Sequence, residues 1–180
     1  MASMSVWEAV SSRRVVRRFA GRPLDDEHLD WILRAGRRAN SSKNQQRWAF
    51  IVARDRDHLR ELAEVGPWAG HVAGAAAAIA LVTPDPARSG VPLSVMFDLG
   101  MAADSMILTA WELGIGSVPA TVYEQALARS LLGYPEDHHC EFLLSFGYPL
   151  DPDELTRPLQ AGGRRPLEDI VHEELSLIHI

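Results

Sequence analysis

A dense cluster of arginines near the N-terminus, in the run RRVVRRF from Arg13 to Phe19, contains residues suited to bind an anion. Because alternate residues of an extended chain share a side, we expect Arg13 and Arg17 to converge on one ligand. The forked donors of guanidinium groups suit a phosphate monoester, which carries roughly two negative charges. The alternative is a solvated basic patch, since all but one of the 18 basic residues are arginine.

A second polar cluster, Ser41-Ser42-x-Asn44-x-Gln46-x-Trp48, lies where a predicted strand begins. Its hydroxyl and amide groups can donate to and accept from the polar edge of a heteroaromatic ring. The same residue types are common turn formers, so an ordinary loop after a helix is the alternative.

Two further segments have residues that could contact a ligand. The run LGIGSVPAT, residues 113–121, follows an apolar helix, and its glycines would let the backbone approach a flat molecule closely. An ordinary helix end that leads into a strand is the alternative. Near the C-terminus, Arg164 and Arg165 form a cationic pair that is, on its own, typical of a solvated turn.

The sequence lacks the signatures of several other kinds of site. Gly70 and Gly74 precede a predicted strand, whereas a dinucleotide-binding loop follows one. No G-x-x-x-x-G-K-[ST] loop, G-x-S-x-G motif or recognisable Ser-His-Asp spacing is present. His138, His139 and Cys140 are adjacent and point in different directions, so we predict no metal site. A single cysteine excludes a disulfide framework.

Length and composition predict one globular domain. At 180 residues, with 47% of them apolar, the chain can build a core without disulfides or metals. A net charge of −6 argues against a nucleic-acid coat. No run reaches the ~18 apolar residues of a membrane span, and no export signal is recognisable. We therefore expect a cytoplasmic protein that binds neither nucleic acid nor membrane.

Hydrophobic periodicity and turn residues predict ten elements in the order α-α-β-α-β-α-β-α-β-α, which indicates one α+β domain. Although alanine favours helix, the short apolar run before Pro84 is interpreted as a buried strand. The helix 94–113 is apolar on most sides, which places it in the middle of the molecule or at a subunit interface. The predicted helices are 6–12, 23–38, 55–64, 94–113, 124–132 and, as a short helix or extended tail, 166–174. The predicted strands are 47–53, 75–83, 115–122 and 141–148.

Taken in order, the four candidate segments resemble the FMN-dependent nitroreductase family over about residues 6–173. The resemblance implies a small, mostly antiparallel sheet of about four strands packed among helices, with a long central helix at a dimer interface. It implies that the arginine cluster holds the FMN phosphate and ribityl chain, and that the polar loop of the partner subunit lines the flavin. Residues 119–121 would lie along the ring, with an N–H from about Thr121 near flavin N5. The implied cofactor-binding residues are Arg13, Arg14, Val15, Arg17, Ser41, Ser42, Asn44, Gln46, Pro119, Ala120, Thr121, Arg164 and Arg165.

The resemblance also implies the reaction and the assembly. A homodimer with two FMN sites would transfer hydride from NADH or NADPH through FMN to a nitroaromatic, quinone or related small-molecule acceptor. Donor and acceptor would occupy one ring face in turn, a ping-pong scheme that needs no catalytic side chain. A non-catalytic FMN-binding or sensing module and a specialised member, such as a reductive dehalogenase-like flavoenzyme, are the alternatives. The short loop 84–92 favours an open site, and a monomer with helix 94–113 in its core is the alternative to the dimer.

Three residues depart from the family pattern. Arg47 stands where the family usually has a proline before the tryptophan. Val122 stands where a glycine often follows residues 119–121, and Gly162 where some members carry a second late cation. We expect Val122 to narrow the space above the ring. The last six residues, 175–180, do not continue the pattern and are interpreted as a translated adapter scar, with a genuine amphipathic tail as the alternative. The predicted domain is therefore 1–174.

Overall fold

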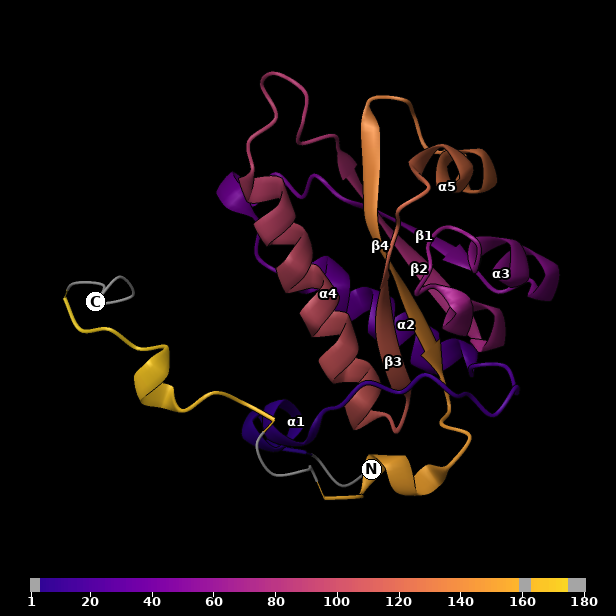
Figure 1. Cartoon of the computed structure of the whole chain (residues 1–180), viewed down its shortest axis with the longest axis vertical. Coiled ribbons are helices and arrows are strands. Elements are labelled where there is room, and N and C mark those ends of the chain that lie inside the picture. The colour runs from indigo at the N-terminus through magenta and orange to yellow at the C-terminus, as the bar shows by residue number, and fades with distance from the viewer. Residues whose placement is uncertain (1–3, 159–162, 175–180) are drawn as a thin grey trace.

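The computed structural model describes residues 4–158 and 163–174, so Gly162 and the suspected scar at 175–180 lie outside the described residues. The described residues form five α-helices, four strands and four 3₁₀ turns (Figure 1). The helices are α1 Val6–Ser12, α2 Asp26–Arg38, α3 Arg56–Leu62, α4 Ser94–Glu112 and α5 Gln125–Leu132. The strands are β1 Ala49–Ala53, β2 Ala77–Pro84, β3 Gly116–Thr121 and β4 His138–Gly147. The 3₁₀ turns are η1 Ser42–Asn44, η2 Gly70–Gly74, η3 Pro152–Leu155 and η4 Leu167–Asp169.

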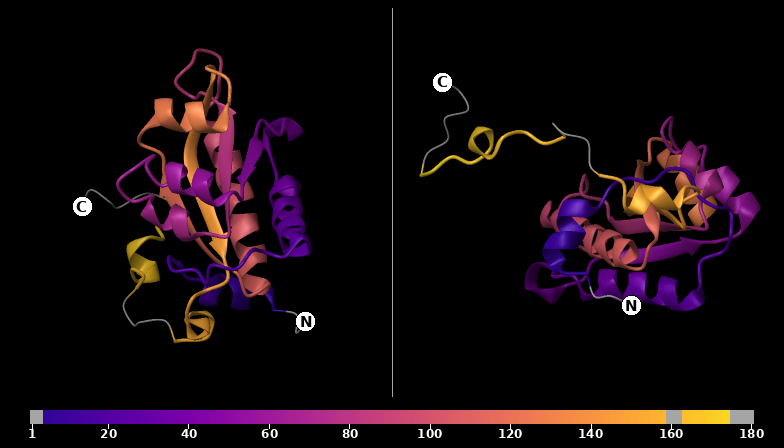
Figure 2. Two further views of the ribbon diagram at one scale, coloured as in Figure 1. Left: turned by 90° about the vertical axis from the view of Figure 1, so that its right-hand side faces the viewer. Right: turned by 90° about the horizontal axis from the view of Figure 1, so that it is seen from below.

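The four strands form one antiparallel sheet in the order β1-β2-β4-β3. Helices α2 and α4 cover one face of this sheet, and α3 and α5 cover the other (Figures 1 and 2). Each face has its own apolar core, with Ile32 and Met106 on the first side and Leu59 and Leu143 on the second. The predicted α+β class and small sheet of four strands are confirmed.

Strand β2 lies inside the sheet and is buried over almost its whole length. The prediction of a strand is confirmed here despite the alanines, because a short apolar run that ends at a proline fits a strand buried on both faces. Strand β4 begins at His138, three residues earlier than predicted, because its pairing with β2 extends as far as Pro84. Within this pairing the register skips Glu141. Strand β1 begins two residues later than predicted, because the backbone N–H of Trp48 closes a turn on Gln46 O (2.8 Å).

Helix α4 is the longest helix, and it packs Leu99, Met106 and Ala110 into the core beside α2. At its N-terminal end the side chains of Leu93 and Phe97 are 77% and 69% exposed. The prediction of a long apolar helix is confirmed, and its place at a subunit interface stays a prediction. Among the described residues, no helix combines the length and the hydropathy that crossing a bilayer requires.

The arginine segment runs from the end of α1 past the outer edge of β3 to the residues that follow β4. The Val16 N–H donates to Ser117 O (3.1 Å), and the Ala20 N–H donates to Tyr148 O (2.8 Å). Val16 is fully buried against Gly116, where an added Cβ would lie 2.6 Å from Val16 Cβ. The segment can therefore lie this close to β3 only because residue 116 has no side chain.

The C-terminal segment 163–174 leaves the rest of the molecule. Drawn in yellow, it runs away from the sheet and helices in Figure 1 and in the right-hand view of Figure 2. It contains η4 and exposes Leu167, Ile170 and Val171. The predicted helix or extended tail over 166–174 is thus a short 3₁₀ turn within an extended segment.

We expect Gly116→Ala to lower the free energy of unfolding by about 1–3 kcal/mol, the usual cost of an extra methylene in a packed core. The new methyl group would collide with the Cβ of Val16, which cannot swing aside as the end of a long side chain can. Urea unfolding measures the change. Gly74→Ala, where an added Cβ meets nothing within 4 Å, is the matched control, and equal effects of the two substitutions would contradict the contact.

Candidate functional site

Two adjacent cavities meet at Pro119, an exposed residue of β3. The first has a volume of about 320 Å³ and is bordered by Arg13, Val15, Asp104 of α4 and mostly apolar residues of α4 and the sheet. The second has a volume of about 350 Å³ and is bordered by Arg17, His71 and the loop that precedes η2. The arginine segment and β3, which the sequence analysis treated as separate candidates, therefore come together within one chain.

Arg13 and Arg17 lie on opposite sides of Pro119. Each borders a different cavity, so their convergence on one ligand, which their spacing predicts, stays a prediction. The Nε atom of Arg13 is buried and has no hydrogen-bond partner among the described residues. A buried donor without an acceptor is unfavourable, so this guanidinium group suits an anionic ligand in the first cavity.

Arg14 is directed elsewhere. Its guanidinium group lies over the ring of Trp111, 5.9 Å from the centroid, and the Trp111 indole N–H donates to Ser12 Oγ (2.9 Å). Arg14 borders neither cavity. In this structure it fastens α1 to α4, and its role as a cofactor ligand stays a prediction.

Strand alternation divides residues 119–122 between two environments. Ala120 and Val122 are buried in the core beneath α3 and α5, whereas Pro119 is exposed at the cavities. The expectation that Val122 narrows the space above a ring is therefore wrong, because its side chain points into that core. Backbone groups at positions 117, 119 and 121 face one edge of the strand. Since Ser117 O accepts from the Val16 N–H at this edge, the Thr121 N–H also points away from β4, toward the free edge.

The polar loop 41–46 has an unusual backbone. Lys43, Asn44 and Gln46 have φ of 53°, 55° and 49°, in the left-handed backbone region that residues other than glycine rarely adopt. Ser41 Oγ accepts the Gln46 N–H (3.0 Å), and the Gln46 side-chain amide donates to Asn44 Oδ1 (3.0 Å). Each such residue is costly, so the surrounding contacts must hold the loop in this shape.

Asp98 of α4 supplies one of these contacts, and the sequence analysis missed it. This residue is 6% exposed, and its carboxylate accepts the Ser42 N–H at 2.9 Å. The signal was present, because helical periodicity places this acidic residue beside Val95 and Leu99 on the buried side of α4. Ser41, Ser42, Asn44 and Gln46 border neither cavity, so a single chain does not bring them to Arg13.

The late arginines also stay apart from the cavities within one chain. Arg164 donates to Gly163 O (3.0 Å), and Arg165 donates to Asp169 O (2.7 Å). Both contacts lie within the segment that runs away from the sheet (Figure 1). Their contribution to a phosphate site stays a prediction.

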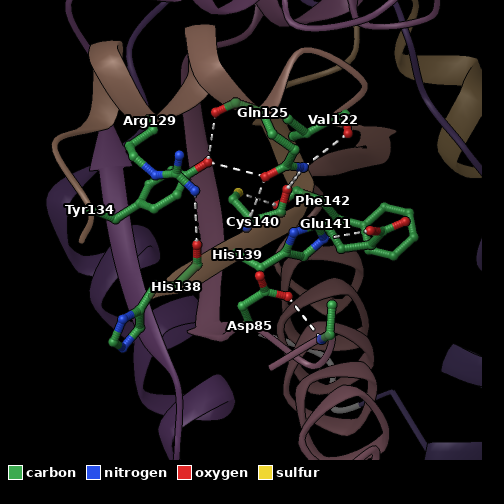
Figure 3. Close-up of polar contacts among 11 residues, drawn as sticks. Asp85, Val122, Gln125, Arg129, Tyr134, His138, His139, Cys140, Glu141 and Phe142 are labelled. Atoms are coloured by element: carbon green, nitrogen blue, oxygen red, sulfur yellow. Dashed lines mark hydrogen bonds and ion pairs between the residues drawn. The ribbon is translucent and has the colours of Figure 1, made fainter. Parts of the chain in front are cut away.

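The backbone carbonyls of His138 and Cys140, two of the residues considered for metal binding, help to attach α5 to β4 (Figure 3). The Gln125 amide donates to Cys140 O (2.7 Å), and the Tyr134 hydroxyl donates to Gln125 O (3.2 Å). Burial raises the pKa of the Cys140 thiol to about 12, so this thiol is not a nucleophile at neutral pH. Within residues 4–158 and 163–174, no three His, Cys, Asp or Glu side chains come together as a metal site.

Comparisons with known proteins show which family the chain resembles. The nitroreductase family model matches residues 10–85 and 68–148. A protein of Archaeoglobus fulgidus with the provisional name NADH dehydrogenase/NAD(P)H nitroreductase is 37% identical over 147 residues, 79% of this chain and 84% of that protein. The NADPH-flavin oxidoreductase of Vibrio harveyi is 27% identical, over 92% of this chain and 72% of that protein. The solved structure of NADPH:FMN oxidoreductase from Vibrio harveyi with NAD⁺ has a TM-score of 0.82 at 24% identity, and the match covers 94% of this chain and 77% of that chain.

We expect Asp98→Ala to lower the free energy of unfolding by about 1.5–3 kcal/mol, the value of a hydrogen bond to a charged group. The loss of the carboxylate would leave the Ser42 N–H without its acceptor and release the strained loop. Asp98→Asn keeps an acceptor oxygen and should lose less, and Asp104→Ala, at an exposed position of the same helix, is the control. Chemical denaturation of the three variants provides the measurement, and an Asp98→Ala variant as stable as Asp104→Ala would refute the role.

Proposed function

The chain belongs to the nitroreductase family and is an oxidoreductase, and on this premise we propose that it transfers hydride from NADH or NADPH through FMN to nitroaromatic, quinone or related acceptors. The observation that carries the proposal is the pair of cavities around Pro119, with one arginine on each side. The Nε atoms of Arg13, Arg14 and Arg129 are all buried without a partner among the described residues, and of these three arginines Arg13 is the one that borders a cavity of this pair.

The residues present fit FMN. Arg13, with the backbone at Val15, would hold the phosphate at the first cavity, and Arg17 would supply positive charge at the second. The exposed face of Pro119 offers a flat apolar surface for a ring, and the free-edge N–H of Thr121 offers a donor beside it. When bound, the flavin supplies the hydride chemistry, so this chain has to bind, orient and shield it. Arg17 would stabilise negative charge that develops on the ligand.

A second copy of the chain would complete the site, and we propose a homodimer. The side chains of Leu93 and Phe97 are largely exposed at one end of α4, beside the strained loop that Asp98 holds. In a homodimer, this loop would carry Ser41, Asn44 and Gln46 to the partner's flavin. The extended segment 163–174, with its exposed apolar side chains, is also available for contact with a partner.

The site is open, which supports a ping-pong scheme. Asp85 N–H donates to Asp137 O (2.9 Å) and Arg88 donates to Glu136 O (3.1 Å), so the loop after β2 is tied to the turn before β4. Residues 84–92 border neither cavity. The nicotinamide donor and the acceptor can then use the same face in turn, and we propose that they do so in the cytoplasm.

We expect the purified protein to bind FMN, to be bleached by NADH or NADPH under anaerobic conditions, and to regain its yellow colour with a nitroaromatic or quinone. An absorption spectrum during anaerobic titration provides the measurement. Bound FMN that neither nicotinamide reduces would indicate a binding module, and a protein that cannot be loaded with FMN would refute the flavoenzyme proposal.

We expect the double substitution Arg13→Ala and Arg17→Ala to raise the Kd for FMN by roughly 100-fold or more, because each charge-assisted hydrogen bond contributes about 1.5–3 kcal/mol. Quenching of FMN fluorescence on titration with apoprotein measures the affinity. The matched control replaces Arg37 and Arg38, which are exposed at the end of α2. Equal affinities of the two double variants would contradict the assignment.

A further inference from the structure

His71 borders the second cavity but belongs to none of the segments that the sequence analysis selected. It lies in η2, it is half-buried, and it shares the cavity with Arg17 and Pro119. Its Nδ1 atom is 3.0 Å from Ser145 Oγ on β4. The ring is therefore anchored to the sheet at one nitrogen while another part of it reaches the cavity.

The contact with Ser145 determines which ring nitrogen carries the proton. Ser145 is fully buried, so its hydroxyl cannot donate to water, and within the described residues the structure gives this hydroxyl only His71 Nδ1 as a partner. A buried hydroxyl needs an acceptor for its proton. The hydroxyl therefore donates, Nδ1 accepts, and a neutral imidazole carries its proton on Nε2.

The Nε2 atom is the free end of this arrangement. It makes no hydrogen bond within residues 4–158 and 163–174, and it is not among the buried atoms that lack partners. Burial, and to a lesser extent the nearby Arg17 guanidinium, lower the pKa of His71 below its usual value. The ring is therefore neutral at neutral pH and presents an N–H donor.

The second cavity thus combines one charged donor, one neutral donor and flat apolar walls. Pro67, Trp68 and Pro119 form the walls, and none of the described residues that border the cavity is a carboxylate. A planar heterocycle with adjacent acceptor atoms and a single negative charge matches this set of groups. A dianion would find only one full positive charge in this cavity.

We propose that His71 donates its Nε2–H to a carbonyl oxygen at the pyrimidine edge of the flavin, beside Arg17, and that Ser145 is the positioning residue that selects this tautomer. The proposal rests on the proposed function. A hydrogen bond to an acceptor strengthens when that acceptor gains negative charge. His71 therefore favours the two-electron-reduced cofactor over the oxidised one.

The tautomer can be tested without any cofactor. We expect the ¹⁵N NMR spectrum of the histidine-labelled apoprotein to show His71 as the neutral Nε2–H form at pH 7.5, with His71→Gln used to assign the signal. Ser145→Ala removes the donor to Nδ1, and we expect the signal to shift toward a mixture of tautomers. A neutral Nδ1–H form or a protonated ring in the wild type would overturn the proposal, whatever the protein binds.

The contact with FMN needs a second measurement. We expect His71→Phe to raise the Kd for oxidised FMN roughly 3- to 10-fold, the value of one neutral hydrogen bond, and to make the midpoint potential of bound FMN more negative. His71→Gln, which keeps an N–H donor, should recover part of both effects. The control is His58→Phe, a half-buried histidine of α3 that borders neither cavity.

The outcomes separate this proposal from the function on which it rests. A wild type that binds and reduces FMN, together with a His71→Phe variant of unchanged Kd and potential, would refute the role of His71 alone. A wild type that does not bind FMN would refute both the proposed function and the contact with His71. Loss of affinity with recovery by His71→Gln would support the donor.

Discussion

The contact between Val16 and Gly116 determines where Arg13 and Arg17 lie relative to β3. Val16 is buried, and its N–H donates to the strand residue that follows the glycine. Arg13 and Arg17 flank this anchor, so each emerges on its own side of Pro119. Without the close approach at Gly116, both guanidinium groups would move away from the edge of β3. Each of the two cavities would then lose the arginine at its border.

The sheet brings together residues that are far apart in the chain. Arg17, His71 and Pro119 meet at one cavity, although about fifty residues separate each from the next. The antiparallel register of β3 and β4 pairs Val118 with Ser145 and Pro119 with Leu144, so Pro119 lies one residue along the strand from the partner of Ser145. Ser145 in turn contacts His71. The site therefore depends on strand pairing rather than on any local motif, which explains why each motif alone has a plain structural alternative.

Much of the fold follows from periodicity, and less of the site does. The apolar runs predict the strands and α4, and the Ser5–Glu8 capping box marks the start of α1. The limits of β1 and β4 depend on pairing with β2, which the sequence does not display. Spacing and family resemblance select Arg13, Val15, Arg17 and Pro119, which the structure places at the borders of the two cavities. His71 is not, because a histidine among glycines gives no sign of the buried hydroxyl that orients it, and Asp98 acts through a partner more than fifty residues away.

The left-handed backbone of Lys43, Asn44 and Gln46 has a consequence for recognition. A loop that is already confined to one conformation has lost its disorder before it meets anything. Association through it then carries a smaller ordering entropy, and complementarity becomes strict, because the loop cannot adapt to a poorly matched surface. In the proposed homodimer such a loop would discriminate sharply among related subunits, so mixed pairs with homologous chains should be disfavoured.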